Sequence, residues 1–301
     1  MAINLDDRYP GRANGKTLSY PQGSFKNRTS PTAKDGTFLE QDWANDQLAF
    51  FQSLIKEAGL TANGVVDTAE ASQYFDALVQ TIRSSAEGRL VGVRAFNTVG
   101  TSTYTPTSGT KSVVVEVQAA GGSGAGAGGT TAGQASAGSG GGAGGYAKSY
   151  LTTGFAGVSI TVGAGGAATG PGAVNGNAGG SSSFAGSLSA TGGGGGISIP
   201  PTNSFPLQRN GGGSGVGSGG SIINARGQIG GIANLIAFGG GLSGPGGASM
   251  LSQGGSYVVG SNPGVAGTHG SGGSGALSQA DGSGHPGGAG GAGIVIVWEY
   301  A

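Results

Sequence analysis

The sequence contains no cysteine and only two histidines, His269 and His285, so disulfides and thiolate chemistry are excluded. Its apolar runs are short, as in residues 294–298, and fall far below the roughly 20 residues needed to span a bilayer. The N-terminus has no basic region followed by an apolar one, so we predict no secretory signal. The net charge is zero, which favours neither nucleic acid nor an acidic membrane as partner.

Charge is also scarce in the second part of the chain, where glycine accumulates. Residues 1–99 hold 8 of the 71 glycines, which leaves 63 for residues 100–301. Residues 1–99 also hold 10 of the 14 basic and 11 of the 14 acidic residues. A change this abrupt predicts a domain boundary, and we place the domains at residues 1–88 and 89–301.

The first domain has the pattern of a small helical module. Apolar residues at helical spacing predict one helix over about 40–58, and Gly59 is a suitable stop. A second helix is predicted over about 68–82, because Asp67 and Glu70 have capping-box spacing before an apolar face. Two short helices make a thin core, which favours oligomerisation or docking.

The second domain has the pattern of a multi-stranded β domain with glycine-rich connections. Short β-rich runs occur at 89–96 and on both sides of a turn at Ser108-Gly109. Later runs are found at 157–166, 181–193, 234–241 (NLIAFGGG), 256–264 and 294–300. The predicted fold is therefore a small α-helical N-terminal module followed by an all-β, glycine-rich C-terminal domain.

The glycine runs themselves leave two structures open. In residues 121–145, 13 of the 25 residues are glycine, and ordering glycine costs the most backbone entropy. Apolar β segments nevertheless interrupt the runs, Ala and Ser are the main companions, and charge is nearly absent. The runs form either packed extended helices with three residues per turn, hydrogen-bonded to one another, or flexible loops on a β core.

No residue set in the sequence predicts catalysis, a metal or a cofactor. Repeated GxGxxG matches lack the following helix that dinucleotide binding needs, and GRANGKT at 11–17 is one residue short of a phosphate loop. Glycan hydrolysis requires paired carboxylates, but residues 100–301 hold only Glu116, Asp281 and Glu299. We predict that the protein is not an enzyme.

Two segments break the glycine pattern with larger side chains and are candidate binding loops. An aromatic residue near Arg or Asn in an exposed loop can stack on a sugar or fill a protein pocket, although such residues can also be core anchors. The candidates in 197–210 are Phe205, Leu207 and Arg209, and those in 249–264 are Met250, Tyr257 and Asn262.

Several quoted stretches resemble known proteins. LDDRYPGRAN, YPQGSFKN and KDGTFLEQDWANDQLAFFQSL resemble the N-terminal region of bacteriophage and prophage tail fibre proteins, over about residues 3–80. TSTYTPTSGTKSVVVEVQAAGGSGAGAGG, SSSFAGSLSATGGGGG and GGAGGAGIVIVWEY resemble the glycine-rich C-terminal domain of phage tail proteins. More loosely, this part is similar to the glycine-rich adhesins of T-even-like phages, in which stacked glycine helices carry receptor-binding loops.

The resemblance implies a virion protein, usually a homotrimer. Its N-terminus would bind a phage tail or baseplate protein, and its C-terminal loops would bind a bacterial surface glycan or outer-membrane protein. The alternatives are a purely structural tail component and, less favoured, a tailspike depolymerase. Candidate tail-attachment residues are Tyr9, Pro10, Tyr20, Phe25, Trp43, Phe50 and Phe51, of which the last three are also suited to helix packing.

Overall fold

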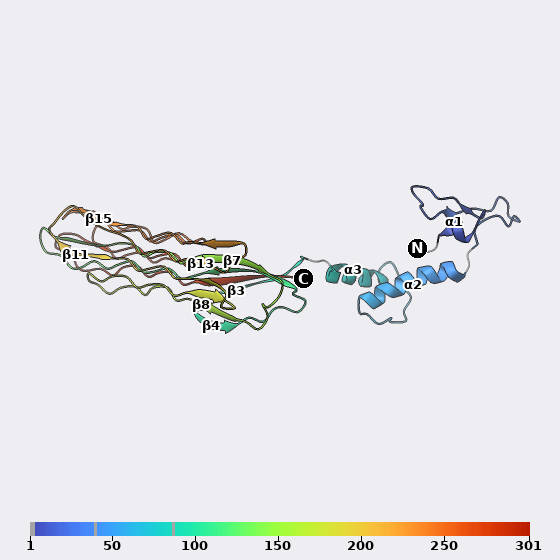
Figure 1. Cartoon of the computed structure of the whole chain (residues 1–301), viewed down its shortest axis with the longest axis horizontal. Coiled ribbons are helices and arrows are strands. Elements are labelled where there is room, and N and C mark those ends of the chain that lie inside the picture. The colour runs from blue at the N-terminus through green and yellow to red at the C-terminus, as the bar shows by residue number, and fades with distance from the viewer. Residues whose placement is uncertain (1–3, 39–40, 86–87) are drawn as a thin grey trace. The chain divides into compact units, whose positions relative to one another are not determined.

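The computed structural model describes residues 4–38, 41–85 and 88–301 (Figure 1). Two compact units divide the chain between residues 87 and 88, next to the predicted domain boundary. Among these residues, the first unit contains the three helices and one two-stranded antiparallel pair, and the second contains the other strands. The structure thus confirms a small helical module followed by a mostly β unit.

The N-terminal unit has two small apolar cores. Its elements are α1 (Leu5–Arg8), β1 (Ala13–Asn14), β2 (Ser24–Phe25), α2 (Gln41–Glu57) and α3 (Gln73–Ser85). One core buries Leu5, Tyr9 and Ala13 under Trp43, and the other buries Ile55, Ala58 and Ala77 between α2 and α3.

The predicted second helix is wrong at its start, because α3 begins at Gln73 and not near residue 68. The carboxylate of Asp67 accepts hydrogen bonds from the backbone N–H groups of Gln73 and Tyr74. Asp67 therefore caps a helix that starts six residues later, after a turn in which the Thr68 hydroxyl accepts from the Ala71 N–H group. The first predicted helix agrees with α2 to within a residue at each end.

The second unit has sixteen strands, and every pairing between them is antiparallel. They are β3 (Leu90–Phe96), β4 (Gly100–Thr103), β5 (Ser112–Gln118), β6 (Ala135–Gly138), β7 (Tyr146–Leu151), β8 (Ser159–Val162), β9 (Ser182–Phe184), β10 (Leu188–Ala190), β11 (Ser198–Thr202), β12 (Leu207–Arg209), β13 (Gly217–Ser218), β14 (Ile223–Ala225), β15 (Ala233–Ala237), β16 (Gly240–Leu242), β17 (Leu277–Ser278) and β18 (Ile294–Tyr300). The strand predicted within 256–264 is not formed. The carbonyl of Val258 accepts one backbone hydrogen bond, from Ser243, and Asn262 forms only an isolated bridge with Leu277.

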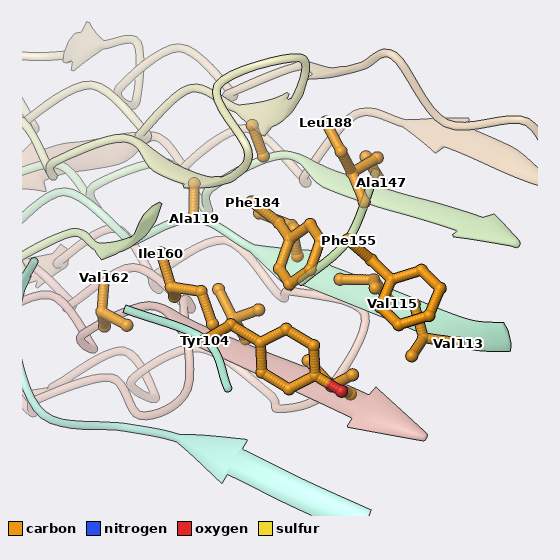
Figure 2. Packing of buried hydrophobic residues seen from close by; sticks show 14 residues of the cluster. Tyr104, Val113, Val115, Ala119, Ala147, Phe155, Ile160, Val162, Phe184 and Leu188 are labelled. Atoms are coloured by element: carbon orange, nitrogen blue, oxygen red, sulfur yellow. The ribbon is translucent and has the colours of Figure 1, made fainter. Parts of the chain in front are cut away.

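Two five-stranded sheets pack face to face at the end of this unit that holds Gly88 and the C-terminus (Figure 1). Their orders are β14-β7-β5-β18-β3 and β13-β10-β9-β8-β4. Alternate residues of β5 and β18 point inward, because side chains along a strand alternate between the two faces. Figure 2 shows Tyr104 and Phe184 among these valines, and their ring centroids are 5.5 Å apart.

Beyond this sandwich the glycine runs are hydrogen-bonded to one another with a period of three residues. Successive backbone N–H groups of 121–127 donate in turn to three different neighbouring segments, each running antiparallel. The first set joins Gly121, Gly124 and Ala127 to Gly291, Gly288 and His285; the second joins Gly122 and Ala125 to Gly142 and Ser139; the third joins Ser123 and Gly126 to Asn177 and Val174. Segment 138–145 repeats the pattern with segments 270–276, 191–197 and 228–231.

These segments lie too close together for side chains at the inward positions. A Cβ atom added to Gly140 would lie 1.8 Å from the carbonyl oxygen of Pro245, and one added to Gly138 would lie 1.9 Å from that of Ala125. Both distances are far below van der Waals contact, so only glycine fits there.

Buried serines accept hydrogen bonds from backbone N–H groups that do not bond to a carbonyl group of the network. The hydroxyls of Ser123, Ser139 and Ser274 accept from the backbone N–H groups of neighbouring segments at 2.7–2.8 Å. All three serines are fully buried. They satisfy backbone donors whose loss of water would otherwise cost free energy.

Candidate functional site

The far end of the glycine-rich unit, opposite Gly88 and Ala301, is formed by short strands and turns (Figure 1). Two three-stranded sheets lie there, in the orders β11-β6-β17 and β12-β15-β16. With the segment 256–262 and the turn 279–282 they make up what we call the tip. The tip is the candidate functional site, since large exposed side chains concentrate there on a scaffold of backbone hydrogen bonds.

An apolar cluster under the tip holds its strands in register. It buries Ile199, Leu235 and Leu277 completely, and Phe205 and Leu207 pack against it. Leu207 and Leu235 are cross-strand partners on β12 and β15, so they point to the same face.

The outer surface of the tip carries large apolar side chains. Ile236 follows the buried Leu235 on β15 and therefore faces outward, with 63% of its surface exposed. Phe238, in the β15–β16 turn, is 53% exposed, and Tyr257 is 56% exposed. Leu242 and Val259 are exposed as well.

Hydrogen bonds join the segments that carry these residues. The N–H group of Ala280 donates to the Phe238 carbonyl, and the Gln279 amide donates to the Gly239 carbonyl. Gln279 in turn donates from its N–H group to the hydroxyl of Ser261. The hairpin turn, the 279–282 turn and the 256–262 segment therefore form one continuous surface.

The structure separates the predicted binding residues. Arg209 and Tyr257 are exposed at the tip, and Asn262 lies there too, where it pairs with Leu277 and donates from its amide to the Val259 carbonyl. Phe205 and Leu207 pack against the apolar cluster. Their position therefore corresponds to the alternative in which such residues anchor the core.

Met250 does not lie at the tip. Its N–H group donates to the side chain of Gln118, the last residue of β5, at the sandwich end of the glycine segments. The segment 249–264 is therefore not a single loop, because it runs from one end of the glycine network to the other.

Sequence reasoning missed Ile236, Phe238, Leu242 and Val259. The stretch NLIAFGGG was interpreted only as a strand. Two signals for an exposed surface were available in that stretch. Leu235 and Ile236 alternate between the inner and outer faces of the strand, and Phe238-Gly239 forms a turn.

The three carboxylates considered for catalysis are not brought together. Glu116 points outward from its sheet and forms an ion pair with Lys148 at 3.0 Å. Glu299 points inward from the adjacent strand and is fully buried. Asp281 lies in the tip turn after β17, with a positive φ of 58°.

Glu299 is tied to the sandwich core by the hydroxyl of Tyr104, which donates to its Oε1 at 2.7 Å. Burial alone would raise the pKa of Glu299, but hydrogen bonds from Thr107 and Tyr104, with the charge of Arg94, bring that pKa below its ordinary value. Burial, together with the hydrogen bond to Glu299, raises the pKa of Tyr104. Both donors bond to Oε1, whereas the buried Oε2 has no hydrogen-bond partner among the described residues. The charged form is thus favoured by the bonds to Oε1 and the charge of Arg94.

The two histidines lie apart, and each has a backbone contact of its own. The backbone of His285 pairs with that of Ala127, and the His269 carbonyl accepts from the hydroxyl of Ser249. Within the part of the chain that the structure describes, no group of three or more His, Asp or Glu side chains could hold a metal ion. No helix among the described residues is long and apolar enough to cross a bilayer.

The candidate attachment residues of the N-terminal unit differ in exposure. Pro10, Tyr20, Phe25, Phe50 and Phe51 are exposed, whereas Tyr9 is buried in the first core and Trp43 packs against it. The Phe51 ring lies 4.9 Å from that of Tyr74, between α2 and α3.

A groove of about 930 Å³ lies beside these helices, lined in part by Ile55, Leu60, Val65 and Tyr74. Val65 and Val66 in its wall are strongly exposed.

Comparisons with known proteins give no family: no family model matches the chain, and no curated protein matches its sequence.

Proposed function

We propose that the protein is a bacteriophage tail fibre or tail-tip adhesin and not an enzyme. Residues 1–87 would attach the chain to a tail or baseplate protein, and the tip would bind a glycan or outer-membrane protein on the bacterial surface. The resemblance of residues 3–80 and 89–301 to phage tail proteins supports this assignment. In this proposal the protein belongs to the virion.

The observation that carries the proposal is the position of the tip. Exposed Ile236, Phe238 and Tyr257 lie at the end of the second unit opposite Gly88, where the chain arrives from the N-terminal unit. An attachment protein needs its binding residues at the end remote from its anchor. A cluster of exposed aromatic and aliphatic side chains is typical of recognition surfaces.

The glycine segments would act as the rigid support of that tip. We propose that they are polyglycine-type helices, since their donors rotate through three neighbours with a period of three. Interior positions without side chains let the backbone groups bond to one another and leave the tip residues to carry specificity.

We further propose that the chain works as a homotrimer. The helices α2 and α3 expose Leu48, Phe50, Phe75, Leu78 and Ile82, which is a large apolar area for so small a unit. Burying these side chains between copies would stabilise the oligomer, and three tips would then bind a cell surface with avidity.

The test is competition for adsorption. Full-length protein is added to permissive bacteria before the phage or tail particle, alongside the double variant Ile236→Ser with Phe238→Ser. The matched control is Ile222→Ser, because Ile222 is similarly exposed but bonded to Lys148 of β7 in the sandwich. We expect wild type and the control to block adsorption and the double variant to need at least about tenfold more protein, a loss of about 1.4 kcal/mol.

Two other outcomes would replace the proposal. If no form binds cells although the protein is incorporated into particles, a purely structural tail role is favoured. If the protein reduces the viscosity of host polysaccharide and Asp281→Asn abolishes that effect, the protein is a depolymerase.

A further inference from the structure

The glycine network ends differently on different sides of the second unit. Segments 121–127 and 138–145 each bond to six neighbouring segments, but the outer segments have fewer neighbours. At the outward positions of the outer segments, a further glycine segment either can or cannot pack and form hydrogen bonds. The side chains at those positions determine whether it can.

On one side the network is closed by isoleucine. Segment 227–231 bonds to 138–145, 212–215 and 245–248, which leaves Ile229 and Ile232 facing outward with 66% and 47% of their surface exposed. Because neighbouring segments approach within a distance that admits only glycine, these side chains prevent another segment from packing there.

A different side is bare backbone. Segment 191–197 bonds to 120–127, 138–145, 174–180 and 212–216, so its remaining side faces away from the network. The N–H groups of Gly192 and Gly195 have no hydrogen-bond partner among the residues that the structure describes. Neither carbonyl of these two glycines accepts a bond from a described residue.

The neighbouring outer segment continues this bare surface. Gly213 bonds through its carbonyl to Gly194, is exposed, and has no heavy atom within 4 Å of the position of an added Cβ. We call the surface formed by Gly192, Gly195 and Gly213 the open glycine face. It carries no charge and no side chain.

We propose that the open glycine face binds a second copy of this chain through the same face. Free donors and free acceptors alternate on it with the period of the network, so an extended glycine segment is the ligand that can pair with both. Charged or bulky partners gain nothing from a surface without side chains. A second copy presents the same unpaired groups at the same spacing, and two such faces are self-complementary.

This contact goes beyond the proposed function and does not depend on it, since it involves neither the tip nor the apolar helices. Its blocking variant is Gly213→Ile, which adds a side chain into open space at a position without a positive φ. The matched control is Gly170→Ile, because Gly170 is also an exposed glycine with open space at its Cβ but lies outside the open glycine face.

The experiment is hydrogen exchange of residues 192–196 in the full-length protein at two concentrations about a hundredfold apart. We expect exchange of the Gly192 and Gly195 amides, which are unpaired within the single chain, to slow at least about tenfold at the higher concentration in wild type and in Gly170→Ile, but not in Gly213→Ile. Exchange that stays fast at both concentrations in wild type would overturn the proposal, as would protection that Gly213→Ile leaves intact. Adsorption competition by Gly213→Ile should equal wild type, so failure here is distinct from failure of the adhesin proposal.

Discussion

Whether a glycine of the network can be substituted depends on which atoms lie nearest to the position of the added Cβ. An added Cβ at Gly140 would meet the Pro245 carbonyl at 1.8 Å, whereas one at Gly213 would meet nothing within 4 Å. Glycine content alone therefore does not tell which glycines matter. What matters is whether another backbone occupies the space beside the Cα atom.

We expect Gly140→Ala to lower the free energy of unfolding by about 3 kcal/mol, because the methyl group forces two hydrogen-bonded segments apart. Gly213→Ala, the control, should change it by at most about 1 kcal/mol. Chemical denaturation followed by circular dichroism measures both. Equal effects of the two substitutions would show that the segments are not packed as closely as described.

The buried carboxylate of Glu299 makes a second residue-scale prediction. Its pKa in the folded protein is lowered, so the charged form contributes stability above the unfolded-state pKa, and that contribution disappears as the pH falls through the lower folded pKa. We expect the melting temperature of wild type to fall with acidification below about pH 4.5 more steeply than that of Glu299→Gln. Melting curves between neutral pH and pH 3 give the comparison, and parallel curves would contradict it.

At the scale of elements, helix α3 illustrates what propensity and packing each contribute. Its apolar residues recur at helical spacing, yet Phe75 and Ile82 remain exposed in the single chain, at 63% and 58%. An amphipathic helix gains most of its stability by burying such a face. The partner that buries it is, in our proposal, another copy of α3.

At a protein concentration low enough to leave the open glycine face unpaired, we expect Phe75→Ser combined with Ile82→Ser to convert the homotrimer into monomers. The helical signal should decrease as well, because α3 then loses the partner that buries its apolar face. Sedimentation velocity measures the mass, and Val93→Ser on the exposed strand β3 is the control, expected to leave the mass unchanged. A wild-type protein that sediments as a monomer would refute the trimer.

At the scale of the whole molecule, contacts in the second unit connect residues far apart in sequence. Gly121 bonds to Gly291, and β18 pairs with both β3 and β5. The N-terminal helices, in contrast, pack against a neighbour in the chain. Distant pairings must close large loops before they gain any stability.

We therefore expect refolding in two phases. The helical signal should recover within milliseconds, and the fluorescence of Trp298 on β18 should recover over seconds or longer. Trp43→Phe isolates the Trp298 signal, since these are the only tryptophans. Recovery of both signals at one rate would show that the two units fold together.

The sequence by itself determined the division of the chain, the helical pattern of α2, and most strands of the sandwich, since composition and periodicity are local properties. It left open whether the glycine runs are ordered, because glycine has no side chain whose pattern could show a face. Only the tertiary structure decided that question, by placing backbone donors and acceptors of distant segments within bonding distance. For the same reason it alone separated Met250 from Tyr257 and brought Phe238 beside Ala280: their positions depend on which segments bond to one another, and no local spacing encodes that choice.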